Sequence, residues 1–299
     1  MVGTGGTMID VKGVEELRQS ALAKVRAEEY DEALALYDAA LAIAETDEQQ
    51  ELITINKADA LVAIERNGPE VQALPSILMR RRNPHHTFLA AYTLMYKQRL
   101  QNEVKRGIFY GQIALEAART ADEPFWKLGA LNELGILSEM DSQFSRAIDY
   151  FEQALSLIDS VRNGRDQEFG ETQIILNLGY NKLLVGQTKD GLQLILSVLD
   201  SVEGPGLLSD SYVALCYGYI DLEEYDKGRY YGEIGLKLAV DARQVRNAHY
   251  LLGEAAYKCG DIEAAEYHFD KLTAFYPEFR NLKSLLYAID LRSMVNFKL

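Results

Sequence analysis

Pairs of small residues twelve positions apart recur along this chain. Gly135 and Ala147 form one such pair, and both stand among large apolar side chains. Small residues at fixed distances from bulky ones allow two helices to cross closely, with apolar side chains packed around the crossing. The chain repeats the interval at four further places: Ala21 and Ala33, Gly179 and Gly191, Cys216 and Gly228, and Gly253 and Ala265. The spacing therefore predicts a helical hairpin that repeats.

The residues around these pairs repeat as well. A large apolar residue lies four positions after the second small residue in several repeats: Tyr37, Phe151, Ile195 and Phe269. The repeats begin near residues 14, 51, 88, 128, 172, 209 and 246, at intervals of 37, 37, 40, 44, 37 and 37. This period is typical of a helical solenoid, because one hairpin cannot bury its own apolar face and must stack on its neighbours. We therefore predict a repeat array rather than two globular domains.

The composition favours the same fold class. Hydrophobic residues make up 48% of the 299 residues, which is enough for a large core, and only six prolines interrupt the chain. Apolar residues recur three and four positions apart, the helical period, and runs of alternating β-branched residues are missing. The sequence predicts an all-α protein.

Two segments resemble tetratricopeptide repeats: LGILSEMDSQFSRAIDYFEQAL at residues 134–155 and LGEAAYKCGDIEAAEYHFDKL at residues 252–272. Pro277 stands where that family ends its second helix. The resemblance covers roughly residues 14–280 and is weakest near residues 51 and 88; in the first of these units Glu70 takes the small-residue position, so we expect a shifted register there. It implies an α-solenoid, a right-handed superhelix of about seven hairpins. The long repeats are similar to those of bacterial peptide-sensing regulators.

The predicted organisation has three parts. Residues 1–13 are a flexible leader, residues 14–279 the repeat array, and residues 280–299 a C-terminal capping helix. A terminal repeat needs a partly polar cover, and the proposed cap carries apolar residues on one face: Leu282, Leu285, Leu286 and Ile289. The alternative for this helix is that it docks a partner.

The resemblance implies that the first helix of each hairpin lines a concave groove. Groove-facing positions are rich in asparagine and tyrosine: Asn56, Tyr92, Tyr96, Asn132, Asn177, Tyr180, Tyr217, Tyr250 and Tyr257. An asparagine amide can pair with both the N–H and the C=O of an extended peptide, and a tyrosine adds rigid area with one hydroxyl. We therefore predict a ligand-binding groove for a peptide. The alternative is that some of the 18 tyrosines pack between hairpins.

The charge of the chain argues against direct binding of nucleic acid. A net charge of −14 repels a phosphate backbone. Arg80, Arg81 and Arg82 form a local basic run, but it precedes Pro84, and cations at a helix C-terminus offset the helix dipole. The groove positions carry few cations, so we do not expect the carboxylate clamp of the family's best-known groove; these cations are Arg18, Arg26 and Arg99.

The sequence lacks a recognisable catalytic or metal site. The histidines do not have the spacing of a zinc-binding helix; they are His85, His86, His249 and His268. Cys216 and Cys259 have no pairing motif, and we expect free, buried thiols in a reducing compartment. No serine or cysteine stands in a known nucleophile motif. We predict no enzyme activity, no cofactor and no bound metal.

The leading hypothesis is a non-enzymatic scaffold or receptor that binds a peptide or protein segment in its groove, such as a signalling-peptide sensor or a regulatory adaptor. No apolar stretch approaches the roughly 20 residues that span a bilayer, so we expect a cytoplasmic protein without a membrane partner. One alternative is a structural subunit that assembles into homo- or hetero-oligomers through its convex face or its ends. Another is a regulator of a partner enzyme.

Overall fold

The computed structural model of this chain describes residues 13–162, 170–277, 287, 288 and 295. Within these residues the secondary structure is helical and contains no strand. The all-α prediction is therefore confirmed. The predicted leader and most of the predicted capping helix lie outside the described residues. Of the latter, Tyr287 packs edge-on against Phe269, with 5.0 Å between the ring centroids, and Val295 is buried in the core.

The chain divides into two compact units, residues 1–137 and residues 138–299, which we call unit 1 and unit 2. Unit 1 contains three helical hairpins and most of the next helix: α1 (Val14–Arg26) with α2 (Tyr30–Ile43), α3 (Asp47–Ala63) with α4 (Pro69–Arg80), α5 (Pro84–Leu100) with α6 (Val104–Thr120), and then α7 (Pro124–Met140), whose last turn belongs to unit 2.

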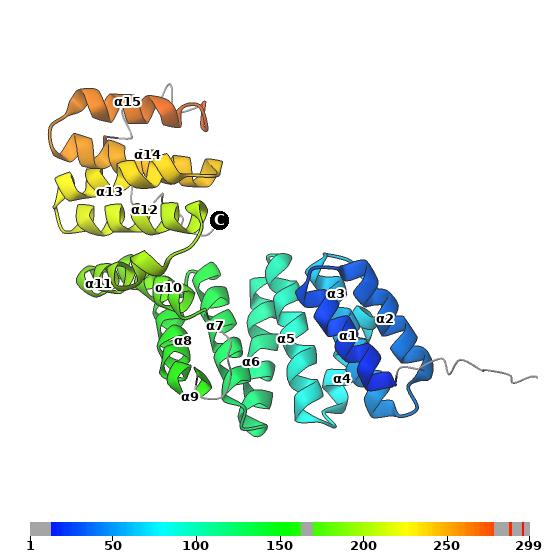
Figure 1. Ribbon diagram of the computed structural model, residues 1–299. Helices are drawn as coiled ribbons and strands as arrows, with labels where there is room; N and C mark the ends of the chain where they lie inside the picture. Colours follow the sequence, from blue (N-terminus) through cyan, green and yellow to red (C-terminus); the bar gives the residue numbers. More distant parts are fainter. Residues whose placement is uncertain (1–12, 163–169, 278–286, 289–294, 296–299) are drawn as a thin grey trace, which may run out of the picture. The chain divides into compact units, whose positions relative to one another are not determined.

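Unit 2 continues the same pattern. Its helices are α8 (Phe144–Ser156), the short α9 (Ile158–Arg162), α10 (Glu171–Leu184) with α11 (Thr188–Val198), α12 (Pro205–Asp221) with α13 (Tyr225–Leu238), and α14 (Ala242–Lys258) with α15 (Ile262–Leu272). A 3-10 turn, η1 (Leu199–Ser201), follows α11. In Figure 1 the helices α12 to α15 stack as successive antiparallel rods. The helix order of the described residues thus follows seven hairpins, with α7 and α8 as the fourth.

The turn inside each hairpin shows why the repeat has its period. One residue of each turn has a left-handed backbone, with φ between 54° and 80°: Glu28, Glu65, Asn102, Ser142, Gly186, Glu223 and Gly260. These positions lie 37, 37, 40, 44, 37 and 37 residues apart, as the sequence repeat predicts. The next amide donates to a carbonyl five residues back, for example Glu103 to Gln98 over 2.8 Å. This Schellman arrangement satisfies the free carbonyls at the end of the first helix.

The small-residue pairs lie where the two helices of a hairpin cross. A methyl group added to Gly191 would lie 2.8 Å from the carbonyl oxygen of Gly179, so these two backbones nearly touch. A methyl group added to Gly253 would lie 2.2 Å from the ring of Phe269, one of the apolar residues that follow the second small site. In unit 1, Ala21 and Ala33 are both fully buried. The predicted close crossing is confirmed for these hairpins.

The second hairpin departs from this pattern at the predicted place. Glu70 holds the small-residue position, and its carboxylate forms an ion pair with Lys57 of 2.7 Å, which lets a charged residue lie close to the facing helix. The basic run ends α4, with Arg81 as its left-handed C-cap and Pro84 at the start of α5. Arg80 and Arg82 form ion pairs with Glu51 and Asp47 on α3. The run is therefore a helix terminus, as expected.

The hairpins stack so that successive first helices lie against one another. In unit 1, α3 contacts both α1 and α5; in unit 2, α12 contacts both α10 and α14. The second helices bury one stripe, which includes Tyr37, Phe151 and Phe269, all without exposed area. We call the side formed by the first helices the first-helix face; it consists of α1, α3, α5 and α7 in unit 1, and of α10, α12 and α14 in unit 2.

Two further points concern the sequence expectations. Both cysteines are free, but only Cys216 is buried; Cys259 is exposed, because it occupies the turn between α14 and α15 rather than a helix crossing. No helix among the described residues is long and apolar enough to cross a membrane.

Candidate functional site

Polar side chains bridge neighbouring helices along the first-helix face of unit 1. Between α1 and α3, the Arg18 guanidinium donates to Oδ1 of Asn56 over 3.0 Å. Between α3 and α5, the Thr93 hydroxyl donates to Oδ1 of Asp59, also over 3.0 Å. Between α5 and α7, Arg99 and Glu133 form an ion pair of 2.9 Å. Each bridge joins residues roughly one repeat apart in the sequence, so the repeat itself brings these groups together.

Aromatic rings extend the same face. Trp126, at the start of α7, stacks on both His85 and Phe88 of α5, with centroid distances of 4.7 and 4.8 Å and nearly parallel planes. The Phe88 ring lies 5.5 Å from that of Tyr92, which in turn rests against Gly129 of α7. A methyl group at residue 129 would still meet the Tyr92 ring at an ordinary 3.6 Å, so the ring lies beside α7 without being crowded.

Two cations of this face, Arg18 and Arg99, already have partners. Arg18 also binds the carboxylate of Glu15, at 2.6 Å, and this hydrogen bond lowers the pKa of Glu15 to about 2. Arg99 places its guanidinium over the Tyr96 ring, 4.8 Å from the centroid, in addition to pairing with Glu133. The face therefore offers no free guanidinium at these two positions.

In unit 2, a chain of amides starts at the end of α7 and follows α10. Asn181 donates through Nδ2 to a carboxylate oxygen of Glu139, over 2.5 Å, and to the backbone oxygen of Asn177, over 2.8 Å. Oδ1 of Asn177 accepts a hydrogen bond from Gln173 over 2.9 Å. Both asparagines are fully buried. Two of their polar atoms have no hydrogen-bond partner in the described structure, Nδ2 of Asn177 and Oδ1 of Asn181.

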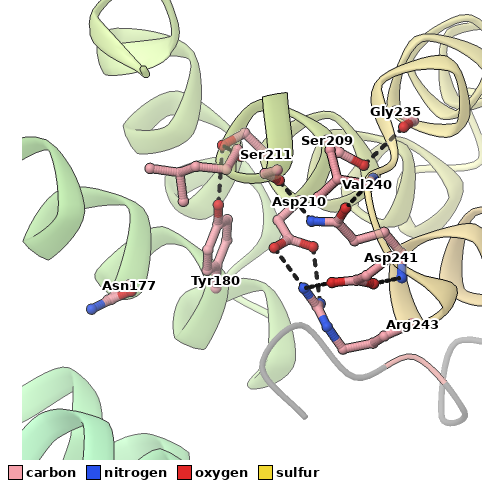
Figure 2. A network of polar contacts seen from close by, with 12 residues as sticks. Asn177, Tyr180, Ser209, Asp210, Ser211, Gly235, Val240, Asp241 and Arg243 are labelled. Carbon is pink, nitrogen blue, oxygen red and sulfur yellow. Dashed lines mark hydrogen bonds and ion pairs between the residues drawn. The ribbon is translucent and has the colours of Figure 1, made fainter. Parts of the chain in front are cut away.

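Figure 2 shows how the network continues from α10 to α12 and α14. The Tyr180 hydroxyl and the Ser211 hydroxyl lie 3.0 Å apart. Arg243 forms two parallel hydrogen bonds of 2.9 Å with the carboxylate of Asp210. Such a bidentate pair fixes both the distance and the orientation of the two helices. Burial raises the pKa of the Tyr180 hydroxyl, so it stays protonated and available as a donor.

The predicted site residues fall into an accessible and a buried group. Partly exposed on the first-helix face are Asn56, Tyr92, Tyr96, Asn132 and Tyr217, and Tyr257 is exposed near the end of α14. Asn177, Tyr180 and Tyr250 are buried, with 0%, 2% and 1% of their area exposed. Unit 1 brings Asn56, Tyr92 and Tyr96 onto adjacent helices, and unit 2 does so for Asn177 and Tyr180 with Tyr217. Tyr257 instead packs against Tyr287, 5.0 Å away.

Several polar residues of this face were not among the predicted set. Asp59 occupies the same repeat position as Tyr96 and Tyr180, and Glu139 and Asp210 also stand at positions that the repeat directs inward. The predicted groove residues included only asparagines and tyrosines. Applying the inward positions to every polar residue type would have found the three carboxylates.

The histidines make side-chain contacts with one another and with a carboxylate. His249 and His268 face each other between α14 and α15, with 2.9 Å between their Nδ1 atoms. Burial lowers the pKa of both to about 4, so at neutral pH one ring donates and the other accepts. Nδ1 of His86 lies 3.0 Å from the Glu51 carboxylate. Among the described residues, no group of three or more potential ligands is placed to hold a metal ion.

Two cavities lie beside the second helices and contain none of the predicted site residues. One of about 580 Å³ is lined by residues of α8, α10 and α11, including Leu155, Leu178 and Leu194. The other, of about 360 Å³, lies against α6 and includes Phe109 and Ile113.

Comparisons with known proteins rest on structure, because no protein-family model and no curated protein matches the sequence. The apo form of the quorum sensor NprR from B. thuringiensis has a TM-score of 0.69 at 15% identity, covering 92% of this chain and 79% of that one. NprR in complex with its cognate peptide NprX has a TM-score of 0.62 at 16% identity, covering 91% of this chain and 81% of that one. A tetratricopeptide repeat protein from Parabacteroides merdae has a TM-score of 0.53 at 13% identity, covering 94% of this chain and 98% of that one.

Likeness at this level of identity establishes the fold. It confirms the resemblance drawn from the repeat motifs, including the similarity to long-repeat, peptide-sensing regulators. The chain therefore has the α-solenoid fold of tetratricopeptide-repeat proteins.

Proposed function

We propose that this chain is a non-enzymatic receptor or scaffold that binds a peptide or protein segment on its first-helix face. The observation that carries the proposal is the pair of unsatisfied amide atoms on α10. Nδ2 of Asn177 is a donor and Oδ1 of Asn181 is an acceptor, and both belong to fully buried side chains. One peptide unit of an extended ligand supplies the matching groups, a C=O for the first and an N–H for the second.

The energetics favour such a ligand. A buried polar group without a partner costs about 1–3 kcal/mol, and a ligand that satisfies it removes that cost. Because both amides are buried, the ligand reaches them only when neighbouring side chains such as Gln173 move aside. NprR, which has the same fold, has been solved with a peptide bound. This supports a peptide as the ligand class.

The first experiment identifies the ligand. The protein is purified from its native source under mild conditions, and bound material is analysed by mass spectrometry. We expect a short peptide or a protein segment. The double variant Asn177→Ala with Asn181→Ala should then bind that ligand about tenfold more weakly or worse in titration calorimetry, because two hydrogen bonds are lost.

The matched control removes two amides from outer positions. Gln153→Ala with Gln193→Ala changes exposed residues on the second helices α8 and α11. This variant should keep the affinity of the original protein. If both double variants bind equally well, the ligand does not contact α10 and the proposal is wrong in its location.

A second candidate function is assembly through the outer face, as a subunit of a homo- or hetero-oligomer or as the regulator of a partner enzyme. Several large apolar side chains are exposed on second helices, including Met79 at 87%, Phe109 at 58% and Tyr230 at 61%. Exposed apolar side chains of this size are typical of interaction surfaces when they cluster. A protein recovered in equal amounts with the chain, and no peptide, would favour this alternative.

The cellular setting proposed for either function is the bacterial cytoplasm. Two free thiols suit a reducing compartment. The net charge of −14 disfavours direct contact of this chain with nucleic acid.

A further inference from the structure

Asp59 is a carboxylate on the first-helix face of unit 1 without a cationic partner. It lies on α3, its side chain reaches solvent, and the Thr93 hydroxyl on α5 donates to it over 3.0 Å. Within the part of the chain that the structure describes, no lysine, arginine or histidine forms an ion pair with it. Glu133 and Asp210, which also bridge first helices, differ from Asp59 because each pairs with an arginine.

The surroundings of Asp59 make its charge costly. Although the side chain is exposed, the helices around it displace part of its water, which raises the pKa of the carboxyl group, and the hydrogen bond from Thr93 opposes this effect. A carboxylate short of water interacts more strongly with an approaching cation than a well-hydrated one does. A cationic group is therefore stabilised more here than beside an ordinary surface aspartate.

The two arginines of the same face are not available to Asp59. Arg18 is held by Glu15 and Asn56, and Arg99 by Glu133 and the Tyr96 ring. Moving either guanidinium to Asp59 would break contacts that it already makes. Neither arginine therefore supplies a cation to Asp59.

Two tyrosine hydroxyls lie near the same position, those of Tyr37 and Tyr92. The charge of Asp59 contributes, after burial, to the raised pKa of the hydroxyls of Tyr37 and Tyr92. The Tyr92 ring lies 5.5 Å from the Phe88 ring, which stacks on Trp126. The faces of aromatic rings attract ammonium and guanidinium groups, so the partly exposed Tyr92 ring adds to the preference set by the carboxylate.

We propose that Asp59 is the anchor of a cation-recognition subsite on the first-helix face, which takes an amino or guanidinium group of the bound peptide. The inference rests on the proposed function and adds the charge of the ligand to it. Two sources supply this chemistry, a lysine or arginine side chain and the free amino terminus of a short peptide. The Thr93 hydroxyl positions the carboxylate without neutralising it.

The stability of the free protein distinguishes a purely structural role of Asp59 from a role in ligand binding. If the residue serves only to link α3 to α5 through Thr93, replacing it destabilises the fold. If it is kept for a ligand, Asp59→Asn retains an oxygen that accepts from Thr93 and removes the unpaired charge. We therefore expect Asp59→Asn to raise the urea midpoint of unfolding at pH 7. The control Asp149→Asn, on the exposed side of α8, should leave the midpoint unchanged.

The binding experiment uses pools of synthetic heptapeptides, acetylated and amidated, with lysine, arginine, norleucine or glutamate fixed at the centre and uncharged residues elsewhere. A fifth pool has central norleucine and a free amino terminus. Equilibrium dialysis with mass spectrometry measures how much of each pool the protein retains. We expect at least one cationic pool to be retained about tenfold more than the acetylated norleucine pool, because a charge-assisted hydrogen bond to a partly desolvated carboxylate is strong.

The variants decide between the outcomes. Asp59→Asn should lose the tenfold preference while retaining the acetylated norleucine pool as the original protein does, and Asp149→Asn should keep the preference. A preference only for the free amino terminus assigns the subsite to that group. Equal retention of all pools, or a preference that survives Asp59→Asn, rejects the subsite and leaves the proposed function standing. A lower urea midpoint for Asp59→Asn also rejects the subsite. If the protein retains none of the pools, both the subsite and the short-peptide receptor are rejected.

Discussion

Gly253 lies where α14 crosses α15, and the structure leaves no room there for a methyl group. A Cβ atom at this position would lie 2.2 Å from Cε1 and 2.6 Å from Cδ1 of Phe269. Carbon atoms in contact are normally about 3.5–4.0 Å apart, so the ring would have to move by about 1.3 Å. Phe269 has no exposed area, and Tyr287 packs against its ring. The ring therefore cannot escape into solvent.

Gly253→Ala should consequently destabilise the fold. Overpacking a core typically costs about 1–3 kcal/mol, and the better helix propensity of alanine returns up to about 1 kcal/mol. We expect a net loss of about 1–2 kcal/mol in the free energy of unfolding, measured by urea unfolding followed by far-UV circular dichroism. The control is Gly129→Ala on α7, where a methyl group would meet the Tyr92 ring at an ordinary 3.6 Å. That variant should be neutral or slightly more stable.

A double-mutant cycle tests the proposed cause. Phe269→Leu alone should cost about 1–2 kcal/mol because it removes buried apolar volume, but it also vacates the space that the new methyl group of Gly253→Ala needs. The double variant should therefore be at least about 1 kcal/mol more stable than the sum of the single effects predicts. Additive effects, or a Gly253→Ala variant as stable as Gly129→Ala, would show that the crossing is not close.

Two further predictions concern a turn and a buried pair. Gly186→Ala should cost about 0.5–1.5 kcal/mol, because its φ of 80° strains an alanine while open space excludes a steric clash; Gly186→Asn should cost less, since asparagine tolerates this backbone and the third hairpin has Asn102 at the same position. Urea midpoints of the two variants check this, and equal midpoints would contradict it. The fold should become less stable as the pH falls from about 6.5 to about 4, because of the His249 and His268 pair. In the unfolded chain these rings bind protons in this range, whereas in the fold their pKa values are about 4 and they stay neutral. The slope should be at most about 1.4 kcal/mol per pH unit for each ring, and His268→Gln should reduce it.

The fold could be predicted from the sequence because the hairpin constrains the chain locally. Each turn needs one left-handed residue at the end of the first helix, and each crossing needs small residues at a fixed distance from it. Gly186 and Gly260 meet the first requirement in the most favourable way, and Gly179 and Gly191 meet the second. Both requirements concern residues within about one repeat, so they leave a period that is visible without a structure.

The exposure of the candidate residues could not be predicted in the same way. Repeat position predicts the direction in which a side chain leaves its helix, and Tyr96 and Tyr180 share that position. Tyr96 remains partly exposed beside Arg99, whereas Tyr180 is buried with its hydroxyl against Ser211. The difference depends on how closely the next first helix packs, and residues on α12 decide this for Tyr180.

Which charges of the first-helix face pair with each other is harder still to predict from the sequence, because the partners lie on different helices. Whether Asp59 is neutralised depends on which partners Arg18 and Arg99 choose, and these lie on other helices. Glu15 lies one helical turn before Arg18 and competes successfully for it, and Glu133 does the same for Arg99 from α7. From the sequence alone, either arginine could be expected to pair with Asp59. The two arginines are already taken, and this leaves the carboxylate to a cation that the described part of the chain does not supply.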